Sequence, residues 1–163
     1  MILGEVREYL DANLKCRPKL EKIILNPGFT GVLLDDGAMG LAMNIRSGGA
    51  LKDPALERFL TATPGRDALE VAFDLEERSA NLKQDKSALL LRSILVSLLN
   101  ALSSPLMNEE YLGALGYTLT TDNDKHASQQ VREGETVTIV GYGGMVRNVA
   151  KIAGKTYVTE LEP

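Results

Sequence analysis

The sequence predicts an α/β protein, and three features indicate this class. Two apolar segments flank an Asp-Gly pair near residue 36, which is typical of an antiparallel hairpin. A long and almost wholly apolar segment at 88–104 has the character of a buried helix. Near the end of the chain, strand, glycine turn, short helix and strand patterns follow one another, as in a βαβ unit.

The chain is expected to begin with an amphipathic helix at residues 2–14. Apolar residues recur there every three or four positions, at Leu3, Val6, Leu10 and Leu14. Pro18 closes this segment, and residues 19–25 follow as a strand. The next three residues, Asn-Pro-Gly, form a turn.

Two further strands are predicted at 29–34 and 38–45, joined by Asp35-Asp36-Gly37. The tight turn between them needs positive φ, which glycine adopts easily. A meander of three antiparallel strands therefore follows the first helix. Gly40 inside the third strand predicts a bulge or a close approach of backbone or ligand.

Three helices are predicted after the meander. The first begins at Pro54, with Asp53 as N-cap, and ends near Thr63. The second covers 66–82. The third covers 88–104, is capped by Asp85 or Ser87, and should be the buried central helix because it is apolar nearly all round. A short helical turn and an extended stretch are expected within 108–121.

The composition argues against nucleic acid and membrane as binding partners. The net charge is −4 and aromatic residues make up 5%, so neither a basic field nor a stacking platform for nucleic acid is expected. The apolar stretch 93–106 is shorter than the roughly 20 residues of a membrane-spanning helix. One cysteine and no signal-peptide pattern favour a cytoplasmic protein without a membrane segment.

The polar segment 122–135 is interpreted as a linker, with the domain boundary after residue 130. Residues 1–130 are predicted to form an α+β domain, and residues 131–163 the incomplete start of a Rossmann-like domain. Two parallel strands do not make a complete sheet, and exposed strand edges tend to pair. We therefore expect a homo-oligomer in which a second copy covers these edges or the apolar helices.

Three motifs in this order resemble one family: the hairpin Gly31–Ala42, the helix segment Leu99-Asn100-Ala101-Leu102, and the turn Val140–Gly143 closing on Thr159-Glu160. The family is the one named for putative heavy-metal chelation. The resemblance implies an enolase-N-terminal-like α+β domain followed by a Rossmann-like domain, with a metal or small-ligand site between them. Family members are longer, so the resemblance also implies truncation in the second domain.

The candidate cofactor-binding residues are Gly141, Tyr142, Gly143, Gly144, Glu160 and Asn100. In a Rossmann turn, glycines let phosphate approach backbone N–H groups, and an acidic residue about 20 positions later meets a ribose hydroxyl. The third glycine of that pattern is replaced by Val146, so a plain strand-to-helix turn is the favoured alternative. Asn100 is predicted to hydrogen-bond across the core or to face a cleft.

Metal-ligating residues are scarce, and the identity of any cofactor stays open, with a divalent or heavy metal suggested by the resemblance. The chain holds one cysteine, Cys16, and one histidine, His126, so a single chain lacks the ligands of a closed Cys/His zinc site. Asp122, Asp124 and His126 could hold a divalent ion weakly, although a solvated linker explains them better. Met39 and Met43 are interpreted as core residues, and Asp35 and Asp36 as turn residues.

Three functions remain open from the sequence. The first is a metal- or ligand-binding protein with a site between the two domains. The second is an enzyme or sensor that binds a nucleotide or similar anion at Gly141–Gly144. The third is a fragment of a longer protein with no activity of its own. No nucleophile-and-base motif is visible, so catalysis is neither predicted nor excluded.

Overall fold

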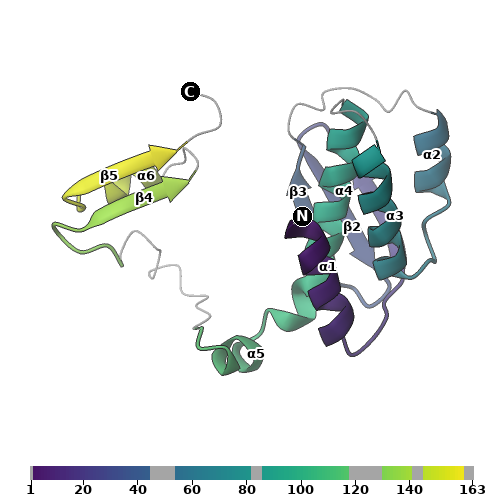
Figure 1. Cartoon of the computed structure of the whole chain (residues 1–163), viewed down its shortest axis with the longest axis horizontal. Helices are drawn as coiled ribbons and strands as arrows, with labels where there is room; N and C mark the ends of the chain where they lie inside the picture. The colour runs from purple at the N-terminus through teal and green to yellow at the C-terminus, as the bar shows by residue number, and fades with distance from the viewer. Residues whose placement is uncertain (1, 45–53, 82–85, 118–129, 141–144, 160–163) are drawn as a thin grey trace. The chain divides into compact units, whose positions relative to one another are not determined.

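The computed structural model describes residues 2–44, 54–81, 86–117, 130–140 and 145–159 (Figure 1). The chain divides into two compact units, Met1–Tyr117 (unit 1) and Thr118–Pro163 (unit 2). Unit 1 contains an antiparallel three-stranded sheet with helices, and unit 2 contains a parallel two-stranded sheet with one helix. The predicted α/β class is confirmed.

The sheet of unit 1 is the predicted meander. Its strands are β1 (Leu20–Leu25), β2 (Phe29–Leu34) and β3 (Met39–Met43), paired antiparallel in the order β1-β2-β3. Gly37 closes the β2–β3 hairpin at φ +86°, a left-handed conformation that glycine adopts without steric cost. The Asp-Gly prediction is therefore confirmed.

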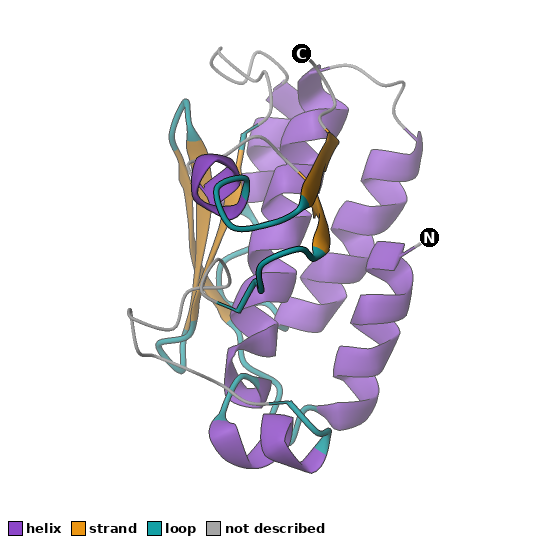
Figure 2. Cartoon of the chain, turned by 90° about the vertical axis from the view of Figure 1, so that its left-hand side faces the viewer, coloured by secondary structure: helices purple, strands orange, loops and turns teal. Residues whose placement is uncertain are grey.

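The helices of unit 1 lie close to their predicted places. They are α1 (Ile2–Asn13), α2 (Pro54–Thr61), α3 (Ala68–Asn81), α4 (Lys86–Ser103), the 3₁₀ turn η1 (Ser104–Leu106) and α5 (Glu109–Ala114). In Figure 2 the long helices stand on one side of the three-stranded sheet. The ends differ from prediction by a few residues, since periodicity locates a helix better than its termini.

Helix α4 is the central helix of unit 1, as predicted. It packs against β2, β3, α1 and α3, and it supplies the largest share of the core. Its fully buried side chains include Leu91, Ile94, Leu95, Leu98 and Leu102. Leu10 of α1, Val32 and Leu34 of β2, and Leu75 of α3 complete this core from the neighbouring elements.

The apolar segment is longer than the stretch 93–106 considered from the sequence. Residues Ser87–Leu106 form a 20-residue segment with mean hydropathy 1.6, which meets the length and composition of a membrane-spanning helix. Half of that segment is buried inside the structure. A core helix meets the same criteria, and α4 fills that place in unit 1.

Unit 2 has the predicted strand, helix, strand order. Strands β4 (Thr136–Val140) and β5 (Lys155–Thr159) pair in parallel, and α6 (Met145–Val149) lies between them in sequence. The assignment of this unit as Rossmann-like and the predicted domain boundary after residue 130 stay predictions, and residues 118–129 lie outside the described part of the chain.

Candidate functional site

Most of the predicted site residues fall outside the described part of the chain. These are Gly141, Tyr142, Gly143, Gly144 and Glu160, together with Asp122, Asp124 and His126. Their proposed roles in binding a cofactor or a metal stay predictions. Asn100 is the predicted site residue that the structure does describe, and it lies on α4 where this helix crosses β3.

A row of polar side chains on α4 binds the backbone of the sheet. Ser93, Ser97 and Asn100 are spaced four and three residues apart, so they share one helix face. The Ser93 hydroxyl donates to the Met43 carbonyl over 3.1 Å, and the Ser97 hydroxyl donates to the Thr30 carbonyl over 2.8 Å. The Asn100 amide donates to the Leu41 carbonyl over 2.8 Å. We call this row the α4 seam.

The α4 seam covers the free edge of β3. β3 is an edge strand, and the carbonyl groups of an edge strand are open to pairing with another chain. Ser93 and Asn100 occupy two of those carbonyls. From the sequence only Asn100 of this row was singled out, and the spacing of Ser93, Ser97 and Asn100 on one helix face is the signal that could have revealed the seam.

Gly40 allows this close contact between helix and strand. A Cβ atom on Gly40 would lie 2.0 Å from the Ser97 carbonyl oxygen and 2.5 Å from the Ala101 nitrogen. Both atoms belong to the α4 backbone and have no room to move independently. Of the predicted possibilities at Gly40, the structure shows the close approach of backbone.

The side chain of Asn100 is therefore fixed by its hydrogen bond to β3. Its side chain is exposed at the surface of unit 1, and its amide is engaged with β3. The sequence predicts a hydrogen bond across the core or a place in a cleft, whereas the structure shows a hydrogen bond to the edge strand β3 at an exposed position. The proposed role of Asn100 in cofactor binding stays a prediction.

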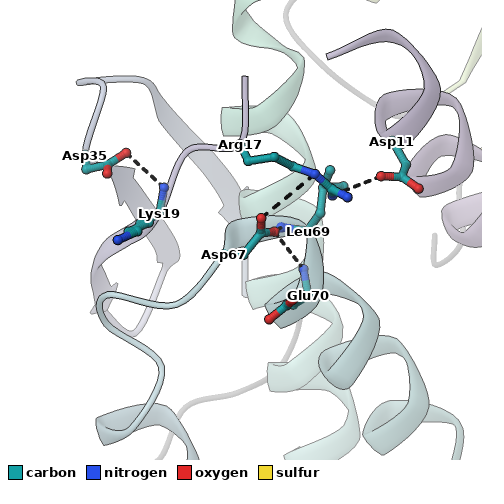
Figure 3. A network of polar contacts seen from close by, with 7 residues as sticks. All are labelled: Asp11, Arg17, Lys19, Asp35, Asp67, Leu69 and Glu70. Carbon is teal, nitrogen blue, oxygen red and sulfur yellow. Dashed lines mark hydrogen bonds and ion pairs between the residues drawn. The ribbon is translucent and has the colours of Figure 1, made fainter. Parts of the chain in front are cut away.

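A second group of polar residues ties the start of α3 to the chain around residue 17 (Figure 3). Arg17 forms an ion pair with Asp11 at 2.9 Å and a longer one with Asp67 at 4.0 Å. Asp67 also caps α3, because its Oδ1 accepts from the backbone N–H groups of Leu69 and Glu70. These contacts explain the carboxylates of this group as structural.

The two aspartates of the hairpin also serve the backbone. Asp35 Oδ1 accepts from the Lys19 N–H (Figure 3). The Asp35 N–H donates back to the Lys19 carbonyl. Asp36 Oδ1 accepts from the Ala38 N–H inside the turn. Their interpretation as turn residues fits these contacts. Met39 and Met43, in contrast, are 63% and 69% exposed, so the prediction that they pack in the core is wrong.

An apolar groove of about 390 Å³ lies between α1, the end of α4, η1 and α5. Most of its walls come from large apolar side chains, including Ile2, Val6, Leu106, Leu112 and Leu115. The hydroxyl groups of Tyr9 and Tyr111 contact each other at this groove. That hydrogen bond is the main reason why the pKa of Tyr111 is raised above its ordinary value of 10.0. The sequence analysis did not identify this groove.

Comparison with known families matches most of unit 1 to a family model. The model of the DUF4213 family, described as "Putative heavy-metal chelation", matches residues 7–103, which is more than half of the chain. The chain belongs to this family. The match spans the sheet and α4, and so includes the α4 seam, and it confirms the family resemblance found in the sequence.

A solved structure supports the fold more widely. A protein with unknown function from the DUF364 family, from Desulfitobacterium hafniense DCB-2, superposes with a TM-score of 0.63 and covers 99% of the chain. At 13% identity, this likeness shows the fold alone. The chain spans 58% of the length of that protein. No curated protein matches the chain.

The DUF4213 description raises the question of whether the described residues fit a metal ion. Within the described ranges, no three His, Cys, Asp or Glu residues lie close enough to hold one. Cys16 is a free and exposed thiol, and Asp11, Asp35 and Asp67 are engaged in the contacts above. The described residues therefore do not fit a metal site on their own.

Proposed function

We propose that this DUF4213 chain is a metal- or small-ligand-binding protein. The observation that supports the proposal is the family match over residues 7–103. The specific activity is open, and no catalytic step is assigned. The cytoplasmic location and the position of the site between the two predicted domains are carried over from the sequence as predictions.

The composition limits the chemistry of a metal site. The whole chain offers one thiol, one imidazole and 22 carboxylates. Thiolate and imidazole ligands suit zinc and other soft ions, whereas carboxylates suit hard ions such as Mg²⁺. A soft-metal site built from Cys16 and His126 would need two further ligands from carboxylates or from a second copy of the chain.

The test is a titration of the full, chelator-treated chain with Zn²⁺, Cd²⁺ and Mg²⁺, followed by calorimetry and by thermal unfolding. We expect at least one of these ions to bind and to raise the melting temperature by several degrees, because a ligand at about 100 times its Kd stabilises the folded state by ~2.7 kcal/mol. The stoichiometry then reports whether one chain or two chains supply the ligands. If none of the three ions binds, metal binding by this chain is wrong.

Two variants assign the soft ligands. Cys16→Ser removes the thiol and His126→Ala removes the imidazole, while Gln130→Ala changes an exposed polar residue near His126 in sequence. If a soft ion uses these donors, Cys16→Ser or His126→Ala should weaken its binding by about tenfold or more, because each residue that coordinates the ion directly contributes strongly to affinity. Gln130→Ala should leave binding unchanged. Equal binding by all three variants would exclude both donors and leave oxygen ligands.

A further inference from the structure

The three-stranded sheet of unit 1 has apolar side chains on both faces. Side chains alternate between the faces of a strand, and residues paired across strands share a face. Thr30 and Val32 are buried on the helix side, where Val32 joins the core and the Thr30 backbone carbonyl accepts from Ser97. The alternate residues form what we call the outer face, and the pairs Phe29–Met43, Gly31–Leu41 and Leu33–Met39 all lie on it.

The outer face is almost free of charge. On β1, Ile24 pairs with Gly31 and therefore belongs to it, and Lys22 pairs with Leu33. Lys22 is the one charged residue among these paired positions of the described strands. An antiparallel sheet with one face on a core normally presents polar residues on the other. The apolar outer face departs from that pattern.

The outer face is also large. The side chains of Ile24, Phe29, Leu41, Met39 and Met43 are 47%, 53%, 59%, 63% and 69% exposed. At about 150–200 Å² for a large apolar side chain, they leave roughly 400–600 Å² of apolar surface open on unit 1 taken by itself. A standard protein interface covers about 800 Å² on each partner, of which some 56–65% is apolar. The open apolar area of this face matches that share.

We propose that the outer face is the surface on which two copies of this chain associate. Two copies would stack their sheets face to face about 10 Å apart, and each would present the same patch to the other. Area and charge both favour a second copy. The open apolar area of the face matches the apolar share of a standard interface, and none of its paired positions is acidic, so two chains of net charge −4 meet there with little repulsion.

The interface between the two copies should involve the outer face and not the edge of β3, which the α4 seam already covers. Ser93 and Asn100 already occupy the Met43 and Leu41 carbonyls, which removes the hydrogen bonds that a new strand would use there. Association therefore rests on side chains. Methionine suits such a surface, because its flexible side chain adapts to an opposing sheet.

The first experiment is sedimentation of the full chain over a range of concentrations. We expect a species with twice the 17.7 kDa mass of the chain. Because the interface is apolar and the chains repel each other, raising the salt from about 50 to 500 mM should leave the dimer intact or tighten it. A monomer at all concentrations overturns the proposal, as does a dimer that salt dissociates.

Substitutions then locate the interface. Met43→Glu and Leu41→Glu each place two carboxylates in the apolar interface, one from each copy, and should raise the dissociation constant by roughly 100-fold or more. Met107→Glu is the matched control, because Met107 is 59% exposed and lies in unit 1 outside the sheet. It should dimerise like the unchanged chain. Circular dichroism confirms that each variant is folded.

Two results would overturn this assignment of the surface. A folded Met43→Glu variant that dimerises like the unchanged chain places the interface elsewhere. Equal loss of the dimer in Met107→Glu also contradicts it, because that residue lies outside the outer face. The metal titration does not depend on these results, since an ion held by one chain alone would bind to a monomer.

Discussion

At the scale of single residues, Gly40 sets how closely α4 approaches the sheet. Gly40→Ala would place a Cβ 2.0 Å from the Ser97 carbonyl oxygen. The helix must then move away from β3, and the hydrogen bonds of the α4 seam must lengthen. We expect a loss of about 3 kcal/mol or more in the free energy of unfolding, measured by urea denaturation.

Gly113→Ala is the matched control for that prediction. Gly113 lies inside α5, and nothing stands within 4 Å of the place where its Cβ would be. Alanine there should be neutral or should stabilise by up to ~1 kcal/mol, because it is the better helix former. A Gly40→Ala variant within 1 kcal/mol of the unchanged chain would mean that α4 shifts more easily than close packing allows.

Sequence reasoning succeeded at residues whose backbone demands are local. Gly37 was predicted from the Asp-Gly pair, and Gly40 from the rarity of glycine inside a strand. It failed at Met39 and Met43, because alternation alone does not say whether a second apolar face is covered. It did not identify the contact between Tyr9 and Tyr111, which are far apart in the sequence.

At the scale of elements, the α4 seam joins helix and sheet through Ser97. Its hydroxyl is fully buried and donates to the carbonyl of Thr30, which is also fully buried. Ser97→Ala leaves that carbonyl with one partner fewer, at a cost of about 1–3 kcal/mol in stability. Thermal unfolding should therefore show a clear drop in melting temperature.

Ser103→Ala tests whether this loss belongs to the contact between elements. Ser103 is on the same helix, but its hydroxyl donates to the Leu99 carbonyl within α4. Alanine there should change stability by less than about 1 kcal/mol, because the lost bond only duplicated a helical backbone contact. Equal losses for Ser97→Ala and Ser103→Ala would argue against a special role for the seam.

The elements themselves were largely predictable, whereas their contacts were not. Apolar periodicity located α1, α3 and α4, and turn residues located the meander. The hydrogen bonds from Ser93 and Ser97 to strand carbonyls were not predicted, because polar residues within an apolar helix pattern do not indicate which groups they bind. The candidate site was predictable only as a family resemblance, because one cysteine and one histidine do not make a closed ligand set in the sequence.

At the scale of the whole molecule, unit 1 contains its own core. The buried cluster draws all its members from α1, the sheet, α3 and α4, together with residues beside them in unit 1. We expect a chain of residues 1–117 to fold cooperatively, with a melting temperature within about 5 °C of the corresponding transition of the full chain. Calorimetry of both chains makes the comparison. A non-cooperative transition in the short chain would show that residues beyond 117 complete the core.

The position of α4 near the end of unit 1 shapes how a new chain folds on the ribosome. In the α4 seam, Ser93, Ser97 and Asn100 bind strand residues that precede them in the sequence by 50, 67 and 59 positions. At roughly 5–20 residues per second, the three strands wait several seconds before α4 is synthesised. During that interval both faces of the sheet are bare and apolar. Slow translation after residue 43 should therefore favour aggregation, and a holdase chaperone bound to the nascent strands should prevent it.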